Sequence, residues 1–501
     1  MPWRVLALLV GLSLPFVFKP VHLDDANFLM LAQGARLDPW RPHNITVNWQ
    51  GMSESAFAVL SNPPGIAWWL APVVTLPVWV MHLWMLLWLP LAVWGAARLS
   101  RALTGRGEAG ALLLCGAPIA VLATQSLMPD LPLLACTLAG LGGLVSARPG
   151  RRWGFALLAG CAALFRYSGV ALIPLVVAWP LLHRDVRSAL RCGLAASLPI
   201  TLLLLHDLHA YGQPHLLAMV GFQGVSDTPD DVLRKLVAGL GALGGAAALP
   251  VLCLAKPGRA GIGFVAGAGL GLMMGQSGLP MVGTMLAVGA GGAVIGAALR
   301  REDLYRVWLV CWLLGGLIFL LKLRFTAARY WLPFFAPAVL LLLRDAPARL
   351  IRVAVVLTPA LSVLLAIDDL ELARAQQRAA ARIIREGTGL FAGHWGWQHH
   401  LEAAGWRAID EDTPVPPGTL LAISHTAWPQ EASPSCVEEI ERFSIPDVWP
   451  GPRVHTATGA ANLHAFLIAG QPPIAAYTPW GFGDDPHDTI TLLRGCQPAP
   501  D

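Results

Sequence analysis

The chain has 501 residues, of which 55% are hydrophobic and 13% are charged, with a formal net charge of +4. Soluble domains carry about 25% charged residues, so this composition excludes an ordinary soluble enzyme. The small basic excess lies mainly in short loops and argues against a nucleic-acid-binding surface.

Apolar stretches of roughly 15 to 23 residues recur over the first three quarters of the chain, which is typical of a polytopic membrane protein. Because backbone groups in lipid must bond within their own segment, these stretches are predicted to be helices. About thirteen spans are expected, at 3–18, 64–84 continuing to 97, 109–123, 131–145, 153–165, 169–182, 195–205, 236–254, 261–275, 279–299, 307–321, 331–343 and 353–367.

Loops rich in Lys and Arg alternate with loops that lack them. The basic loops are 98–106, 148–152, 184–191, 256–259, 300–306 and 344–352. The positive-inside rule places these loops and the amino terminus in the cytoplasm. We therefore expect a multi-pass protein of the plasma (inner) membrane. No small-residue cleavage site follows the first span, so it is expected to be retained.

The composition changes near residue 368. Residues 369–386 are rich in Ala, Arg, Gln and Glu, which predicts an exposed helix. Short apolar runs broken by Pro and Gly follow, and they predict a small α/β domain. We expect an all-α transmembrane catalytic domain at 1–367 and a C-terminal extracytoplasmic (periplasmic) α/β domain at 368–501.

Cysteine usage fits this layout. Six of the eight cysteines lie in or beside apolar spans, where cysteine behaves as a small hydrophobic residue; the outer domain holds Cys436 and Cys496. In an oxidising compartment these two form a candidate disulfide, provided that their positions come within reach.

Three carboxylates lie at the outer edge of the membrane. Asp24 and Asp25 follow the first span, and Asp130 opens a later one. Carboxylates this close to a bilayer are costly and mark a reaction site or a translocation path by default. The plainer alternatives are a solvated helix end for the pair and a helix cap for Asp130.

The same side of the membrane holds a rigid corner and several cations. The long loop 22–62 ends in Asn62-Pro63-Pro64, whose prolines fix the chain where it re-enters the membrane. The cations are Arg166, Lys322, Arg324 and Arg329. Arginine suits phosphate because its charge is permanent and its donors are paired, although any of these side chains could also only anchor the chain at the interface.

Taken in order, these motifs resemble a known family. They are Asp24-Asp25-Ala26-Asn27-Phe28, Asn62-Pro63-Pro64, Pro129-Asp130-Leu131-Pro132-Leu133 and Arg329-Tyr330-Trp331-Leu332-Pro333. Together they resemble the GT-C class of membrane glycosyltransferases, in the branch of protein O-mannosyltransferases and the lipid A aminoarabinose transferase (glycosyltransferase family 39-like). That branch usually has Asp-Glu where this chain has Asp24-Asp25, and Lys or His at the position of Asn62.

The resemblance implies transfer of a sugar from a polyprenyl-phosphate-linked donor to an acceptor protein, lipid or glycan on the outer side. Such a transfer needs a base near the acceptor hydroxyl and cations near the departing phosphate. In this hypothesis Asp24 is the base, Asp25 orients the acceptor or binds a divalent metal ion, and Asp130 positions the acceptor or tunes Asp24. The donor phosphate would be bound by Arg166, Arg324, Arg329 and Lys322.

Two other classes of function stay open. A polytopic transporter or lipid flippase would also have many spans with a few charges, but such proteins often show internal repeats with sites at midplane. Here no repeat is visible and the charges gather at one face. A scaffold with an outer binding domain is the third reading, for which so many spans would be unnecessary. The sugar, the acceptor and any metal requirement are left open by the residues.

Overall fold

The structure is a computed structural model that describes residues 2–49, 51–223, 228–274, 279–299, 303–433, 436–465, 467–468 and 476–496. The expected span 261–275 ends, and the basic loop 300–306 begins, at residues outside these ranges.

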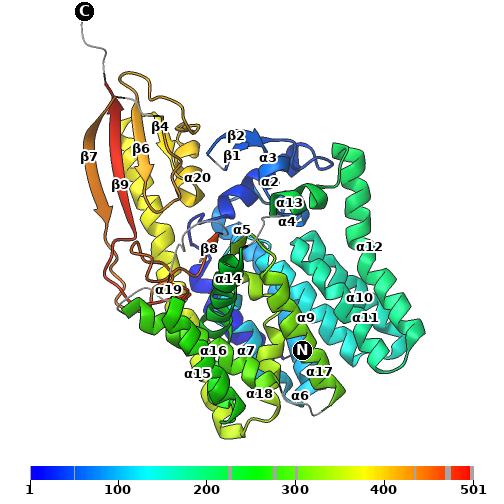
Figure 1. Cartoon of the computed structure of the whole chain (residues 1–501). Coiled ribbons are helices and arrows are strands. Elements are labelled where there is room, and N and C mark those ends of the chain that lie inside the picture. Colours follow the sequence, from blue (N-terminus) through cyan, green and yellow to red (C-terminus); the bar gives the residue numbers. More distant parts are fainter. Residues whose placement is uncertain are drawn as a thin grey trace, which may run out of the picture.

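The fold is mostly helical (Figure 1). The helices of the first half are α1 (Trp3–Ser13), α2 (Asp25–Leu37), α3 (Ala56–Val59), α4 (Gly65–Leu70), α5 (Val78–Met85), α6 (Leu89–Thr104), α7 (Gly107–Cys115), α8 (Pro118–Ala123), α9 (Asp130–Ser146), α10 (Arg152–Gly160), α11 (Leu172–Leu182), α12 (Val186–Tyr211), α13 (His215–Gln223) and α14 (Pro229–Ala242). The second half holds α15 (Arg259–Met274), α16 (Leu279–Ala298), α17 (Leu304–Leu320), α18 (Ala336–Arg344), α19 (Ala348–Ile383) and α20 (Trp395–Ala403). Two short helical turns matter for the site, η5 (Tyr167–Ala171) and η8 (Ala328–Trp331).

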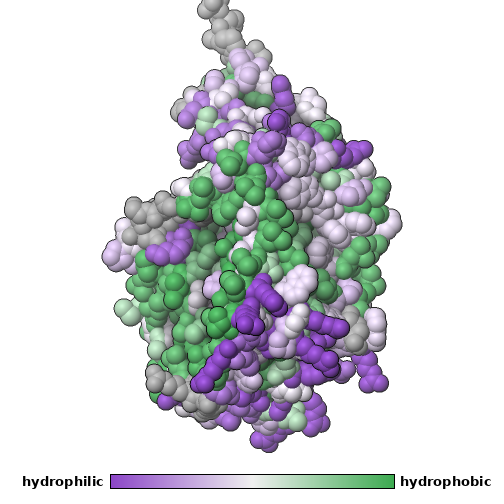
Figure 2. Space-filling view, turned by 90° about the vertical axis from the view of Figure 1, so that its right-hand side faces the viewer, coloured by the Kyte–Doolittle hydropathy of each residue, from purple (hydrophilic) through white to green (hydrophobic). Residues whose placement is uncertain are grey.

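Five helical stretches in the described part of the chain are long and apolar enough to cross a membrane. They are Val78–Thr104, Val186–Tyr211, Pro229–Leu254, Pro280–Ala298 and Ala348–Glu386, and five shorter apolar helices accompany them. Apolar side chains cover the middle of the face shown in Figure 2, and polar side chains gather toward its lower end. These features support a multi-pass membrane protein. The count of thirteen spans stays a prediction, because the expected span 64–84 is divided between α4 and α5.

Small residues allow the central helices to approach closely. A Cβ on Gly95 of α6 would lie 2.2 Å from the backbone nitrogen of Ala139 in α9, and one on Gly140 would meet Ala159 of α10 at 2.6 Å. Close approach of this kind replaces the hydrophobic driving force that helices lack in lipid. As a result α9 is buried from Asp130 to Leu144, and its first residue is held rigidly.

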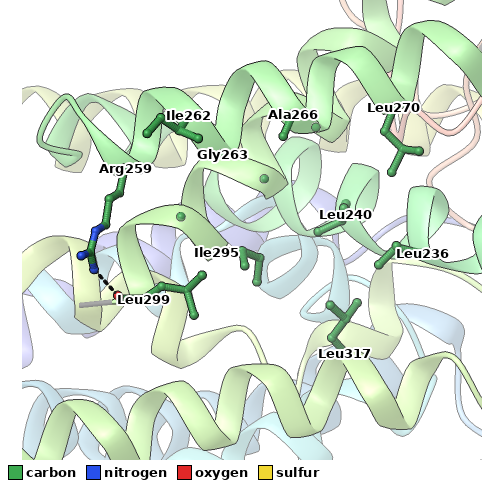
Figure 3. Close-up of a pocket in the computed structure, with 13 residues that line it drawn as sticks. Leu236, Leu240, Arg259, Ile262, Gly263, Ala266, Leu270, Ile295, Leu299 and Leu317 are labelled. Carbon is green, nitrogen blue, oxygen red and sulfur yellow. Dashed lines mark hydrogen bonds between the residues drawn. The ribbon is translucent and has the colours of Figure 1, made fainter. Parts of the chain in front are cut away.

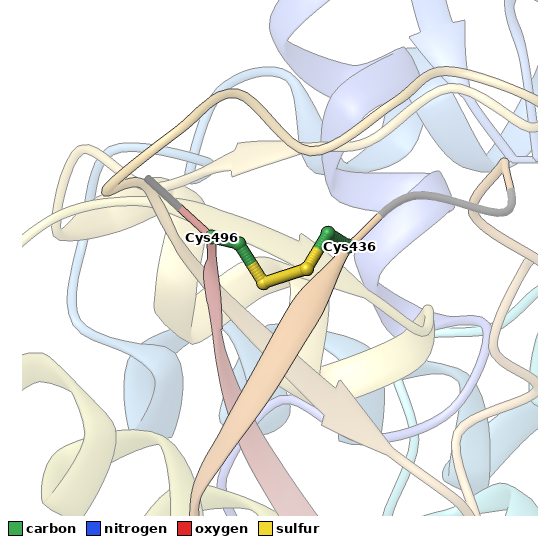
Figure 4. The surroundings of a disulfide bond; sticks show 2 residues. All are labelled: Cys436 and Cys496. Atoms are coloured by element: carbon green, nitrogen blue, oxygen red, sulfur yellow. A yellow bond between two sulfur atoms is a disulfide. The ribbon is translucent and has the colours of Figure 1, made fainter. Parts of the chain in front are cut away.

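The C-terminal region contains the expected mixed α/β structure. A five-stranded sheet has the order β5-β4-β6-β9-β7, with β4 (Leu390–Ala392), β5 (Arg407–Ala408), β6 (Leu420–Ser424), β7 (Val437–Ile445) and β9 (Asp488–Gly495). β4 is parallel to β5 and β6, whereas β9 is antiparallel to β6 and β7. A disulfide joins Cys436, just before β7, to Cys496, just after β9 (Figure 4), as the sequence suggested.

Two further strand pairs lie outside this sheet, one local and one between distant parts of the chain. β1 (Thr46–Asn48) pairs with β2 (Ser53–Ser55) within the first long loop. β3 (Phe325–Thr326) pairs with β8 (Leu467–Ile468), so the C-terminal region is hydrogen-bonded to the segment that leads into η8.

Helix α19 crosses the expected domain boundary without a break. It runs from Ala348 to Ile383, and its second half packs on the sheet through Ala379, Ala380 and Ile383. The expectation of an exposed helix at 369–386 is therefore wrong for the face of α19 that packs on the sheet. Asp369 and Leu372 are also buried. The Arg and Glu residues of the segment cover the other face, which is why composition alone suggested exposure.

Candidate active site

The start of α2 places two adjacent carboxylates in different surroundings. Leu23, just before them, has φ of 48°, a left-handed conformation that is unusual for a bulky residue. Backbone of this kind costs about 1–3 kcal/mol and clusters at functional sites. The bend lets Asp24 face a partly open space, with 23% of its side chain exposed, while Asp25 turns into the core and is fully buried.

Asp24 forms an ion pair with Arg329, in which Nη2 of the guanidinium lies 2.5 Å from Oδ2 of the carboxylate. The partners are 305 positions apart in the sequence. Arg329 lies in η8, which is anchored on both sides: Trp331 donates to the carbonyl of Gly239 at 2.8 Å, and the N–H of Ala328 donates to the carbonyl of Leu463 at 3.2 Å. The arginine is therefore held by both α14 and the C-terminal region.

Asp130 forms a second ion pair, with Arg166. Nε of Arg166 lies 2.8 Å from Oδ1 of Asp130, and the two side chains are 9% and 3% exposed. Asp130 is the first residue of α9, where a carboxylate is favoured by the helix dipole. Arg166 precedes η5 in an extended conformation, so its side chain is directed from the turn between α10 and α11 toward the start of α9.

Tyr330 joins the two ion pairs. The guanidinium carbons of Arg166 and Arg329 lie 5.4 and 5.7 Å from the centre of its ring, within the range of a cation–π contact. Both arginines retain unused donors: Nη2 of Arg166 and Nε of Arg329 are buried without a hydrogen-bond partner among the described residues. Buried guanidinium donors are costly to leave unpaired, so this cluster is suited to an anionic ligand.

Asp25 holds the backbone around the site. Its Oδ1 accepts from the N–H of Leu127 at 2.7 Å and its Oδ2 from the N–H of His22 at 3.3 Å. Burial raises the pKa of Asp25 to about 7, although Lys19 and these hydrogen bonds lower it. Leu127 lies three residues before Asp130, so this carboxylate ties the loop that carries Asp130 to the loop that carries Asp24.

The proline corner packs against the turn that precedes Arg166. Pro63 and Pro64 are buried and Asn62 is half-buried, with its carbonyl 3.1 Å from Nε2 of His43. Gly65 follows at the start of α4, and a Cβ there would lie 2.2 Å from the carbonyl oxygen of Leu164. Only glycine fits this contact, and it presses the corner against the turn that leads into Arg166.

The other two expected cations come shortly before Arg329 in the chain. Lys322 is exposed after α17, and Arg324 is half-buried immediately before β3. Sequence reasoning did not single out Tyr330, although it lies inside one of the quoted motifs. It also missed a buried group behind Asp24, in which Lys19 donates to Asp369. The isolated lysine in an apolar segment, Phe16 to Pro20, was the available signal for that group.

A large apolar groove lies between α14, α15, α16 and α17 (Figure 3). Its volume is about 510 Å³, and its walls include Leu236, Leu240, Ile262, Ile295 and Leu317. Arg259 lies at one end, where it donates to the carbonyl of Leu299. The groove has α14 in common with the ion-pair cluster, because Gly239 of that helix accepts from Trp331.

No protein-family model matches the chain, and no curated protein matches it. Its fold is similar to that of ArnT from Cupriavidus metallidurans bound to undecaprenyl phosphate, at 15% identity over 84% of this chain and 92% of that one, with a TM-score of 0.43. For ArnT in the apo state the identity is 18%, over 79% and 84% of the two chains, with a TM-score of 0.40.

A third similar structure is the arabinofuranosyltransferase AftD from Mycobacteria, at 16% identity, with a TM-score of 0.40. The match covers 99% of this chain but 40% of that one. Because the TM-scores are below 0.5, we infer function from the residues of this chain.

Proposed function

We propose that the chain is an integral membrane glycosyltransferase that moves a sugar from a polyprenyl-phosphate-linked donor to an acceptor on the outer side of the membrane. The observation that carries this proposal is the pair of arginines, 166 and 329, that lie against one tyrosine ring with buried donors left over. A phosphate bridging them would use those donors and would place its sugar beside Asp24.

The reaction follows from this placement. The acceptor hydroxyl attacks the anomeric carbon, the bond from that carbon to the phosphate oxygen breaks, and the polyprenyl phosphate leaves with the electron pair. Asp24 takes the proton of the hydroxyl, a role that contributes about 10²–10⁴-fold in rate. Arg166 and Arg329 stabilise the negative charge that develops on the phosphate. Asp130 keeps Arg166 in place through their ion pair.

Asp25 receives a different role from the one expected of it. Both of its oxygens already accept backbone N–H groups, and its side chain is fully buried. These contacts favour a positioning residue over a group that touches the acceptor or a metal ion. Arg324 and Lys322 remain candidates for contacts to the donor at the rim of the site.

The apolar groove suits the polyprenyl tail. Its walls are aliphatic side chains of α14 to α17, and hydrocarbon burial there requires no polar partner. The outer location of the site and of residues 368–501 rests on the basic loops. Two of these basic segments meet in ion pairs, Arg306 with Asp345 and Arg344 with Asp303, at the start of α17 and the end of α18.

Turnover of labelled polyprenyl-phosphate sugars by the purified protein tests the proposal. Asp24→Asn should abolish most turnover, and Asp38→Asn, at the other end of the same helix, should not, since Asp38 only caps local backbone N–H groups. Equal turnover by the parent and Asp24→Asn would discard the base. Consumption of none of these donors, together with their movement across vesicles, would establish a transporter instead.

A further inference from the structure

Two histidines from distant segments of the chain converge on one carboxylate oxygen that belongs to a third segment. Nε2 of His22 lies 3.2 Å, and Nε2 of His464 lies 2.8 Å, from Oδ1 of Asp369. The two imidazole rings are nearly perpendicular, with centres 5.7 Å apart. His22 follows α1, Asp369 belongs to α19 and His464 comes from the C-terminal region, so the cluster joins segments that are otherwise far apart in the chain.

We infer that His22, Asp369 and His464 form a structural zinc site that staples the C-terminal region to the loop carrying Asp24. Two imidazole nitrogens and one carboxylate oxygen are a ligand set that zinc favours. Zinc bonds of about 2.0–2.2 Å would set tetrahedral ligand atoms roughly 3.3 Å apart. The two nitrogen–oxygen separations, 3.2 and 2.8 Å, are close to that spacing, and all three ligand atoms lie within 4.8 Å of one another.

A lysine holds the carboxylate of the cluster in place. Lys19 donates to Oδ2 of Asp369, which orients the carboxylate and leaves Oδ1 for the metal, as outer partners do in other metal sites. Nδ1 of His22 is buried without a hydrogen-bond partner among the described residues, so this nitrogen can carry the ring proton and leave the lone pair of Nε2 for the metal. The fully buried carboxylate of Asp25 lies close enough to interact with both Lys19 and Asp369.

Another histidine belongs to the same segment as His464. His455 lies within electrostatic reach of His464 and His22, and its Nδ1 is buried without a hydrogen-bond partner among the described residues. Residues 455 and 462 are bridged in antiparallel fashion, so His455 and His464 extend from one folded loop. The ligand atoms that lie within 4.8 Å of one another are those of His22, Asp369 and His464, so a water molecule would complete the tetrahedron.

Asp368, Asp447 and His487 form a second group of potential metal ligands. A buried arginine already occupies this group. Arg453 is fully buried, with its Nε 2.7 Å from Asp447. Its Nη2 lies 3.2 Å from Nδ1 of His487 and donates to it, so the ring proton of the neutral imidazole is on Nε2, which faces Asp447 at 3.2 Å. This group has no lone pair left for a metal at that nitrogen.

Metal content tests the inference without reference to the transfer reaction. The full chain, purified in detergent, should contain one zinc ion by elemental analysis, with X-ray absorption showing nitrogen and oxygen ligands. Removing zinc with a chelator should lower the melting temperature, and adding zinc chloride should restore it. No bound zinc together with no thermal response to zinc chloride, or coordination by sulfur in the parent chain, would overturn the inference.

Variants at His464 separate a metal site from a hydrogen-bond network. His464→Ala should weaken zinc binding at least about tenfold, whereas His425→Ala, which changes an exposed histidine just after β6, should not. His464→Cys should recover zinc binding, because a thiolate binds zinc although a thiol is a weak hydrogen-bond donor. Zinc content that is equal in His464→Ala and the parent would contradict the site. Since these readouts do not involve turnover, the site can fail while the transferase stands, and the reverse.

Discussion

Replacing Arg329 by lysine separates charge from geometry at the proposed phosphate site. Arg329 uses Nη2 for Asp24 and keeps a buried, unused Nε. A lysine preserves the positive charge, so the carboxylate stays neutralised and the fold should persist. A single ammonium, however, is not a planar fork of donors and cannot serve the carboxylate and a phosphate in the same way.

The loss should equal that of one charge-stabilising donor. We expect kcat/KM for the donor to fall by about 10²–10³, or about 2.7–4 kcal/mol, with little change in melting temperature. The assay is steady-state turnover of a labelled polyprenyl-phosphate sugar. Arg36→Lys, an exposed arginine near the end of α2, is the matched control and should behave like the parent.

A double-mutant cycle with Arg166→Lys sharpens the test. Because both guanidinium groups lie against Tyr330, they should act on one phosphate, and their effects should be coupled by about 0.5–3 kcal/mol. A loss of less than about threefold in Arg329→Lys, under 1 kcal/mol of barrier, would refute the reasoning. So would strictly additive effects of the two substitutions, since these would mean that the arginines act at separate sites.

Three further outcomes are expected. Asp25→Asn should keep turnover within about tenfold of the parent, or 1.4 kcal/mol, because the amide oxygen can still accept from the N–H of Leu127. Steady-state kinetics would show this. Total loss of turnover in a stable variant would assign Asp25 a chemical role. Gly65→Ala should destabilise the protein by about 1–3 kcal/mol, since its Cβ would overlap the carbonyl of Leu164; thermal denaturation in detergent would measure it. Burial raises the pKa of Asp488 to about 6. Its protonated form therefore contributes stability that is fully present below about pH 4 and is lost as the pH rises through 6. Asp488→Asn should flatten the melting-temperature profile between pH 4 and 7.

Matched controls accompany these variants. Gly154→Ala adds a Cβ that would meet nothing within 4 Å, so it should leave the melting temperature unchanged. Asp484→Asn changes an exposed carboxylate four residues from Asp488 and should keep the pH profile of the parent. A Gly65→Ala variant as stable as Gly154→Ala, or an Asp488→Asn variant with an unaltered profile, would contradict the packing and burial described above.

The sequence singled out the candidate site residues but did not show how they pair. Hydropathy and the alternation of basic loops predict that Asp24, Asp130, Arg166 and Arg329 lie on one side of the membrane, and the structure brings them into two ion pairs. Which acid meets which base depends on how helices far apart in sequence pack, and no local pattern encodes that.

The different environments of Asp24 and Asp25 were also beyond the sequence. Two adjacent carboxylates look alike in a linear motif, but the left-handed backbone at Leu23 turns one toward open space and the other into the core. Similarly, the composition of 369–386 resembled a solvated helix because its charged residues are visible in sequence, whereas the packing of α19 against the sheet is not. The disulfide was predictable because the two cysteines alone occupy the C-terminal region.

The most direct test of the proposed site is a cryo-electron-microscopy structure of the Asp24→Asn variant with bound polyprenyl phosphate. We expect phosphate oxygens within about 2.7–3.2 Å, hydrogen-bond distance, of Nε of Arg329 and Nη2 of Arg166, with the hydrocarbon tail in the groove between α14 and α17. A phosphate bound away from both arginines, with each guanidinium still facing only its own carboxylate, would contradict a transferase site at this position.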